Sequence, residues 1–187
     1  PAMPNEPLIF VEVALTDHVP HSIQDILADD RPVLPVDAFT TATFYSISNC
    51  QKGLAGISFG NSLIKTVVHN LSADMNKIKQ FVTLSPIPSL AKWVQKQNID
   101  VSDLETAETT PALTAHYLCY AKRADGQPAD PVARFHLNNG ARVHAIHQHA
   151  DTAESARKHS FGMMVNYLYS LPDIAQNHEK YASGKVV

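Results

Sequence analysis

Short apolar runs recur along the chain, and their composition predicts strands. Runs of four to ten residues that are rich in valine, isoleucine, aromatic and other apolar side chains favour extended structure. Such runs are found at residues 8–16, 42–48, 81–85, 141–150 and 161–170. The first of them, LIFVEVALT, is apolar almost throughout. We therefore predict that this first strand is buried on both faces.

A longer helical pattern follows the second strand. Residues 62–74 carry apolar side chains at intervals of three and four, which places them on one stripe of a helix. Asn61 or Ser62 is predicted to cap it. Shorter helices are predicted at residues 21–28, 90–94 and 111–123. Strands that alternate with helices, followed by strands alone, predict a mixed α/β domain.

Length and composition narrow the class of protein. The 187 residues suffice for one domain with one core, and 44% hydrophobic with 18% charged residues is typical of a soluble globular chain. A net charge of −3 gives no general attraction to nucleic acid or to an anionic membrane, so we expect neither as a partner. Cys50 and Cys119 are too few and too far apart for a disulfide scaffold. We expect a cytoplasmic protein.

Three glycines punctuate the stretch between the second strand and the long helix. Gly53, Gly56 and Gly60 leave backbone N–H groups uncovered, and the positive end of the following helix points into the same space. This arrangement suits an anion such as a pyrophosphate. The spacing matches neither the dinucleotide fingerprint nor the P-loop. A purely structural use of these glycines in turns and close packing is the alternative.

Four of the ten histidines lie between residues 134 and 150. In a strand, His147 and His149 would share one face and could chelate zinc, with His144 on the other face. No H-E-x-x-H or C-x-x-C motif supplies a third ligand, so we expect no metal and favour partly exposed histidines on an edge strand. His136 stands apart, between apolar neighbours and an Asn-Asn-Gly turn signal, where a structural role and a catalytic role are both open.

Four blocks of sequence together resemble the catalytic domain of malonyl-CoA decarboxylase. They are CQKGLAGISFGNSLIK at 50–65, TLSPIP at 83–88, PVARFHLNNGAR at 131–142 and GMMVNYLYS at 162–170. The resemblance implies a fold like that of the GCN5-related N-acetyltransferases, a mixed sheet flanked by helices. It also implies that residues 1–187 form a single acyl-CoA-binding catalytic domain, without the family's N-terminal helical domain and the first part of its acyltransferase-like fold. The segment between Ser85 and His136 is also shorter than is usual in the family. The chain could be a fragment of a larger enzyme or a reduced relative of the family.

The same resemblance implies roles for individual residues. Ser85 matches the family's catalytic serine, His136 its catalytic histidine, and Tyr169 a tyrosine that lines its site. The loop that holds the coenzyme A pyrophosphate would comprise Ala55, Gly56, Ile57, Ser58, Phe59, Gly60 and Asn61. Two structural alternatives stand beside these roles. Ser85 could cap a helix that begins near Ser89, and Tyr169 could be a core residue that shares a strand face with Tyr167.

The reaction implied is the conversion of malonyl-CoA to acetyl-CoA and CO2. The thioester carbonyl can hold the electron pair left by CO2 as an enolate, so no cofactor or metal is required. His136 would protonate the new carbanion, since an unperturbed imidazole has a pKa of about 6.5. Ser85 would bind the malonyl carboxylate or hold His136 in register. The partners expected are malonyl-CoA and acetyl-CoA, the upstream part of the same protein, and further copies of the chain in a homo-oligomer.

Three other functions compete with this one. An acyl-CoA-dependent acyltransferase of the same fold would need an acceptor amine. A coenzyme A binding module without catalysis would lack part of the site. A zinc hydrolase would be built on His147 and His149, although the chain offers no third ligand motif.

Overall fold

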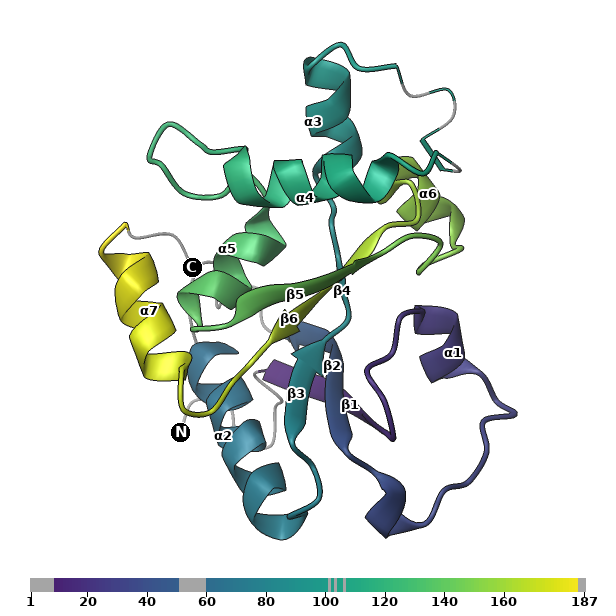
Figure 1. Ribbon diagram of the computed structural model, residues 1–187, viewed down its shortest axis with the longest axis vertical. Coiled ribbons are helices and arrows are strands. Elements are labelled where there is room, and N and C mark those ends of the chain that lie inside the picture. Colours follow the sequence, from purple (N-terminus) through teal and green to yellow (C-terminus); the bar gives the residue numbers. More distant parts are fainter. Residues whose placement is uncertain (1–8, 51–59, 101, 103, 106, 185–187) are drawn as a thin grey trace.

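The structure is a computed structural model that describes residues 9–50, 60–100, 102, 104–105 and 107–184, and every structural statement below concerns these residues. In this described part of the chain, six strands form one sheet, in the order β1-β2-β3-β6, with β4 and β5 also paired to β6 (Figure 1). The strands are β1 (Ile9–Thr16), β2 (Thr41–Asn49), β3 (Gln80–Thr83), β4 (Ser85–Pro86), β5 (Arg142–His147) and β6 (Met164–Leu168). The five predicted strand regions are confirmed, and the third of them is divided between β3 and β4.

The sheet is mostly antiparallel, and the exception is the pair β2 and β3. These two strands are parallel and are joined through helix α2 (Gly60–Asp74), which forms the crossover that parallel strands require. β6 runs antiparallel to β3, β4 and β5. β1 pairs with β2 at the edge of the sheet. The prediction that the first strand is buried on both faces is therefore wrong, and Phe10 is 44% exposed.

Seven α-helices accompany the sheet in the described part of the chain. Besides α2 they are α1 (Ile23–Leu27), α3 (Leu90–Lys96), α4 (Thr110–Tyr120), α5 (Pro131–Asn138), α6 (Glu154–Ser160) and α7 (Ile174–Ala182), with a 3-10 turn at Val36–Ala38. The predicted helices are confirmed as α1, α2, α3 and α4. The prediction that only strands follow is wrong, because α5, α6 and α7 lie in that part of the chain. α2 begins at Gly60, so Asn61 and Ser62 lie inside its first turn and do not precede it.

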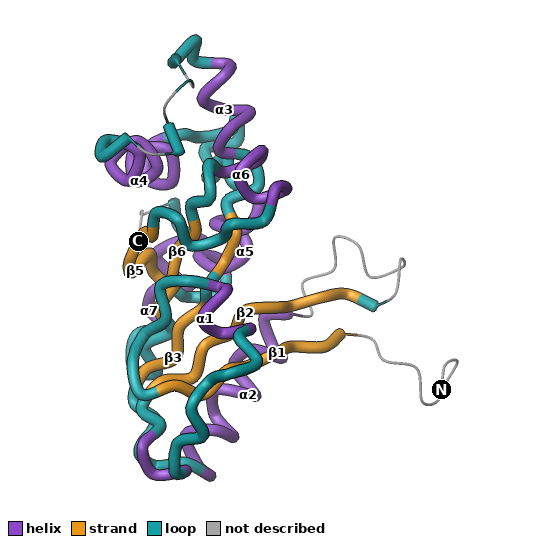
Figure 2. The backbone as a smooth tube through the Cα atoms, turned by 90° about the vertical axis from the view of Figure 1, so that its right-hand side faces the viewer, coloured by secondary structure: helices purple, strands orange, loops and turns teal. Residues whose placement is uncertain are grey.

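Helices cover both faces and one end of the sheet. α3, α4 and α6 gather at one end of the molecule and α2 lies toward the other (Figures 1 and 2). The main core lies between one sheet face and these helices, and includes Phe44, Ile64 and Tyr167. A smaller cluster on the other face packs Leu84 and Met164 against α1. The prediction of a mixed α/β domain, with its sheet flanked by helices, is confirmed. No helix in the ranges given above is long and apolar enough to cross a membrane.

Helix α5 carries His136, and its first turn is fixed by a buried cap. Asp130 accepts hydrogen bonds from the N–H groups of Val132 at 2.9 Å and Ala133 at 3.0 Å, and Pro131 occupies the first helical position. Asp130 is almost fully buried, and burial raises the pKa of its carboxyl group. The side chain of Asp130, together with Pro131, therefore fixes where helix α5 begins.

Loss of this cap is expected to weaken the fold. Asp130→Ala should lower the free energy of unfolding by about 1 kcal/mol, because two N–H groups lose their acceptor. Asp130→Asn is the matched control, since its side-chain oxygen can still accept while the buried charge is removed. Urea denaturation followed by circular dichroism measures both variants. An alanine variant as stable as the asparagine variant would show that the cap is unimportant.

Candidate active site

Ser85, His136 and Tyr169 come together on one face of the sheet. The Oγ atom of Ser85 lies 3.2 Å from Nε2 of His136, and the hydroxyl of Tyr169 lies 2.8 Å from Nδ1 of the same ring. Ser85 is in β4, His136 is in the last turn of α5, and Tyr169 follows β6. Segments 51 and 33 residues apart in sequence thus converge on a single imidazole. The structure places all three predicted catalytic side chains in one hydrogen-bonded row.

The imidazole is packed between aromatic rings. The ring of Tyr167 stacks on His136 at a centroid distance of 4.6 Å and an angle of 24°. Phe135 and Tyr169 meet the same ring edge-on. Ser85, His136 and Tyr169 are 5%, 3% and 1% exposed. The row is therefore held rigidly and is nearly closed to bulk water.

The hydrogen bonds run in one direction along the row. Ser85 donates its hydroxyl hydrogen to Oγ1 of Thr83 at 2.8 Å, so its own oxygen is left to accept from His136. His136 then carries its hydrogen on Nε2, and its Nδ1 accepts from the hydroxyl of Tyr169. The tautomer of the ring follows from these partners. Nε2 is the nitrogen that faces the serine with a proton to give.

Burial sets the charge of the imidazole. It lowers the pKa of His136 to about 3, because a charged ring would lose its hydration and no carboxylate is among the partners given above. Burial also raises the pKa of Tyr169 well above its ordinary value. The expectation that the ring titrates near neutral pH is therefore wrong for the protein without ligand. At pH 7 the whole row is neutral.

The structural alternatives for two of these residues have different outcomes. Ser85 hydrogen-bonds to Thr83 and His136, while Ser89 occupies the position before α3, so the capping role for Ser85 is wrong. Tyr169 is a core residue, as the alternative predicts, with its ring 6.4 Å from that of Phe44. Its hydroxyl nevertheless reaches His136. The side chain of Tyr169 therefore packs in the core and also contacts the site.

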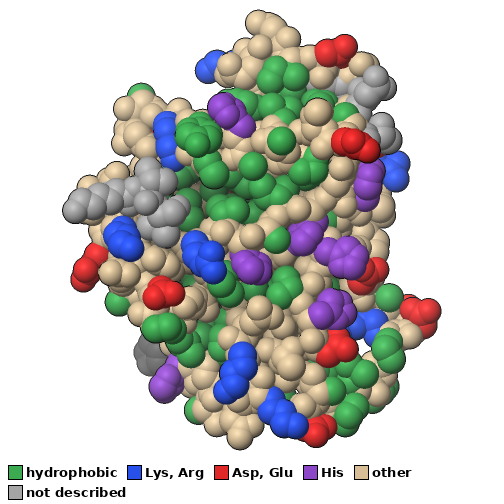
Figure 3. Space-filling view, viewed as in Figure 1, with side chains coloured by type: hydrophobic (Ala, Val, Ile, Leu, Met, Phe, Trp, Pro, Cys, Tyr) green, Lys and Arg blue, Asp and Glu red, His purple; other side chains and the backbone are tan. Residues whose placement is uncertain are grey.

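The histidines of β5 do not form a metal site. The strand ends at His147, and His149 lies beyond it in a turn with a φ of 55°, so the two rings do not share a strand face as predicted. Nε2 of His147 instead hydrogen-bonds to Oδ1 of Asn166. His144 and His149 are exposed and His147 is half-buried, and histidine side chains gather on the face shown in Figure 3. Among the described residues no group of three His, Cys, Asp or Glu side chains could hold a metal ion.

The predicted coenzyme A loop falls between β2 and α2 in the sequence. Its residues Ala55, Gly56, Ile57, Ser58 and Phe59 lie outside the described residues. Gly60 and Asn61 are the first two residues of α2. The loop thus connects the two parallel strands through their crossover helix, and its role in binding stays a prediction.

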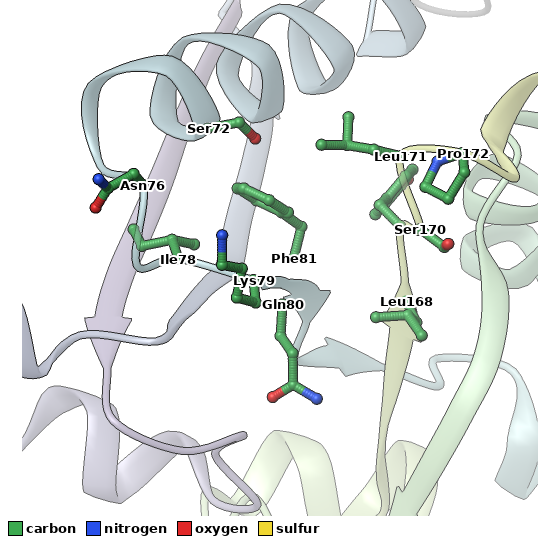
Figure 4. Close-up of a pocket in the computed structure, with 11 residues that line it drawn as sticks. Ser72, Asn76, Ile78, Lys79, Gln80, Phe81, Leu168, Ser170, Leu171 and Pro172 are labelled. Carbon is green, nitrogen blue, oxygen red and sulfur yellow. The ribbon is translucent and has the colours of Figure 1, made fainter.

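A pocket of about 400 Å³ opens at the far end of β3 from Ser85. Its walls come from the end of α2, the start of β3 and the segment after β6 (Figure 4). Polar side chains such as Lys79 and Gln80 face apolar ones such as Leu168 across it. Tyr169 contributes to one wall, whereas Ser85 and His136 do not. The pocket thus includes one member of the hydrogen-bonded row, Tyr169, but neither Ser85 nor His136.

Sequence reasoning missed Thr83, which is the hydrogen-bond acceptor of Ser85. Its side chain is completely buried and lies two residues before Ser85, so alternation along an extended chain places both on one face. This two-residue spacing from Ser85 was the feature of the sequence that could have pointed to Thr83. Without the structure, however, nothing distinguished this threonine from the other polar residues of the strand.

The family model for the malonyl-CoA decarboxylase C-terminal domain matches residues 1–110 and 101–187, which together span the whole chain. The chain belongs to the malonyl-CoA decarboxylase family. A mitochondrial malonyl-CoA decarboxylase from Anser anser anser is 36% identical over 230 residues, covering 98% of this chain and 45% of the relative. The chain thus spans about half the length of that family member.

Solved structures of family members agree with the fold. The crystal structure of malonyl-CoA decarboxylase from Rhodopseudomonas palustris is 41% identical, with a TM-score of 0.88, covering 100% of this chain and 52% of that one. The protein of the same name from Agrobacterium vitis is 43% identical, with a TM-score of 0.86, covering 97% of this chain and 51% of that one. The architecture described above is therefore that of the family.

Proposed function

We propose that this chain is the catalytic part of an enzyme that converts malonyl-CoA to acetyl-CoA and CO2. The observation that carries the proposal is the row of Ser85, His136 and Tyr169, in which His136 contacts both of the other residues and the three come from separate blocks of the sequence. Membership of the family supports the substrate. The buried imidazole of His136 supports the chemistry, because it can deliver a proton once the anionic substrate is bound beside it.

The substrate supplies its own means of stabilising the carbanion. The bond between the carboxylate carbon and the methylene carbon breaks, CO2 leaves, and the electron pair enters the thioester carbonyl as an enolate. The methylene carbon then takes a proton and becomes the methyl group of acetyl-CoA. The protein has to orient the malonyl group and deliver that proton.

The depressed pKa of His136 gives the imidazole two states that suit this cycle. Without substrate, burial keeps the ring neutral. The malonyl carboxylate brings a negative charge next to the ring, which favours the protonated form and raises the pKa of His136 as substrate binds. On protonation the ring takes up a proton from water at Nδ1, and the hydroxyl of Tyr169 turns to accept it. After CO2 has left, Nε2 donates its proton to the methylene carbon, which leaves a neutral ring with its hydrogen on Nδ1. Exchange with water then restores the Nε2 tautomer. The ring is thus charged while an anionic substrate or intermediate is beside it.

The loop of residues 55–61 is proposed to hold the pyrophosphate of coenzyme A. It precedes α2, whose first backbone N–H groups have no partner within the helix and whose dipole favours an anion there. Its glycines allow close approach of the main chain to a phosphate.

Removal of the serine hydroxyl is expected to slow the reaction without unfolding the chain. Ser85→Ala should lower kcat by about 10- to 100-fold, because Nε2 of His136 loses its acceptor and its fixed direction. Ser89→Ala, at the position before α3, is the matched control and should leave kcat unchanged. Steady-state kinetics with malonyl-CoA measures both. Equal kcat values for the two variants would contradict the proposed role of Ser85.

The proposed function has a direct test. The chain is incubated with malonyl-CoA labelled at the carboxylate carbon, and released CO2, acetyl-CoA and free coenzyme A are followed together. Equal amounts of CO2 and acetyl-CoA, with no effect of a chelator, support decarboxylation. Binding without CO2 release would identify a binding module, and consumption of acetyl-CoA on addition of an amine would identify an acyltransferase. Release of free coenzyme A that a chelator abolishes would identify a metal-dependent hydrolase.

A further inference from the structure

We infer that Thr83 is a positioning residue that fixes the direction of the hydrogen bonds through Ser85 and His136. The inference rests on the proposed function for its catalytic meaning, but its structural part stands on contacts within the sheet. Thr83 is completely buried, and its Oγ1 atom accepts from Ser85 at 2.8 Å.

The sheet is altered at the point where Thr83 lies. Val82 is paired with Leu168 and Ser85 with Val165, so the register between the two segments is the same on either side. Continuing that register places Thr83 opposite Tyr167. In a regular ladder the N–H of Tyr167 would donate to the carbonyl of Thr83, as the N–H of Tyr169 does to the carbonyl of Phe81 at 2.8 Å.

Side chains replace the backbone bond at this one position. The N–H of Tyr167 donates to Oγ1 of Thr83 at 3.1 Å. The carbonyl of Thr83 accepts instead from Nδ2 of Asn166 at 2.6 Å, and Asn166 is itself completely buried. β3 ends here and β4 begins two residues later. The threonine hydroxyl therefore takes over a position in the ladder that main-chain atoms normally occupy.

Because a side-chain bond replaces the backbone bond here, Oγ1 of Thr83 is held in place as an acceptor for Ser85. The bond from Tyr167 holds the oxygen in place from the opposite strand, so the serine hydrogen has a defined partner. With its hydrogen directed to Thr83, Ser85 accepts from the imidazole, which requires the hydrogen of His136 on Nε2. Without the threonine hydroxyl, Ser85 would turn its hydrogen toward Nε2, and the ring hydrogen would move to Nδ1. Thr83 thus determines which nitrogen can donate.

Asn166 supports the threonine from the other face of the sheet. Its amide group also donates to the carbonyl of Pro20 at 3.3 Å, and its Oδ1 atom hydrogen-bonds to His147. All of these contacts involve groups that are not in the reactive row. His147 on β5, which the sequence suggested as a metal ligand, therefore takes part in holding Thr83 through Asn166.

The test compares Thr83→Val, which keeps the shape and loses the hydroxyl, with Thr83→Ser, which keeps the hydroxyl. Thr114→Val is the matched control, because it removes another fully buried threonine hydroxyl, in α4, away from the row. Two-bond ¹H–¹⁵N spectra of the histidine-labelled chain report the tautomer of each ring. The signals of His136 are identified by their loss in His136→Gln.

We expect the hydrogen of His136 on Nε2 in the unaltered chain, in Thr83→Ser and in Thr114→Val, and on Nδ1 in Thr83→Val. With malonyl-CoA, kcat of Thr83→Val should fall by about 10- to 100-fold with little change in KM, and Thr83→Ser should retain most of it. An Nε2 tautomer in a folded Thr83→Val variant would overturn the inference. If Thr83→Val does not fold, Thr83→Ser and the unaltered chain provide the test. An Nδ1 tautomer of His136 in either of them would also overturn the inference. The spectra need no turnover, so failure of the proposed function is distinguishable from failure of this inference.

Discussion

Replacing His136 with glutamine is expected to lower the turnover of malonyl-CoA by about 10²- to 10⁴-fold, the range typical for loss of a general acid. Glutamine can keep a donor and an acceptor in the place of the two ring nitrogens, but it cannot carry a transferable proton at neutral pH. The variant should therefore still bind the substrate. Measured kcat and KM separate these two effects, because loss of the proton donor lowers kcat and leaves KM largely intact.

A matched control lies on helix α6. His159 is exposed, and its Nδ1 atom hydrogen-bonds only to a carbonyl within the same helix in the contacts of the described chain. His159→Gln should therefore turn over malonyl-CoA at the unaltered rate. Near-normal CO2 release by a folded His136→Gln variant would remove the imidazole from the proposed mechanism.

Acid is expected to destabilise the fold through the same imidazole. Burial lowers the pKa of His136 from 6.5 to about 3 in the folded protein. Between these values the unfolded chain binds a proton that the folded chain does not, so unfolding becomes more favourable as the pH falls. The contribution is complete above pH 6.5 and is lost toward pH 3, at roughly 1.4 kcal/mol for each pH unit. Below pH 3 nothing further is lost.

Comparison with His136→Gln isolates this contribution from that of other groups. On going from pH 7 to pH 4.5, the unaltered chain should lose about 3 kcal/mol more of its unfolding free energy than the glutamine variant. Urea denaturation at both pH values gives the four free energies required. Parallel losses in the two proteins would mean that the ring is hydrated in the folded state, contrary to its burial.

The helix with the longest periodic pattern could be predicted from the sequence, whereas α5, α6 and α7 were missed. The apolar stripe that includes Ile64 and Val68 predicted α2 correctly. Both side chains are fully buried, which is why the helix has an apolar face. Helix α5 was missed although Asp130 and Pro131 are a recognisable start signal. The burial of the first strand was overestimated, because an apolar sequence does not reveal that a strand lies at an edge.

The residues of the site could be named from resemblance, but their arrangement could not. Ser85 and His136 are 51 residues apart, and no local pattern shows that their side chains meet. Nor could the sequence give the charge of the ring, because the pKa of His136 depends on the aromatic residues packed round it. Thr83 was overlooked for the same reason, since its part follows from a backbone bond that is absent from the ladder.

Gly140 connects helix α5, which carries His136, to helix α7. Gly140 has a φ of 82°, and a Cβ atom there would come within 2.2 Å of the carbonyl oxygen of Ile174, at the start of α7. Asn177 on α7 also donates to the carbonyl of Gly140 at 3.2 Å. A chain truncated before α7 would keep Ser85, His136 and Tyr169. However, α5 would lose its contact with α7, and the ring of His136 would no longer be held in a fixed position. We therefore expect removal of α7 to disturb the position of His136 as well as the stability of the fold.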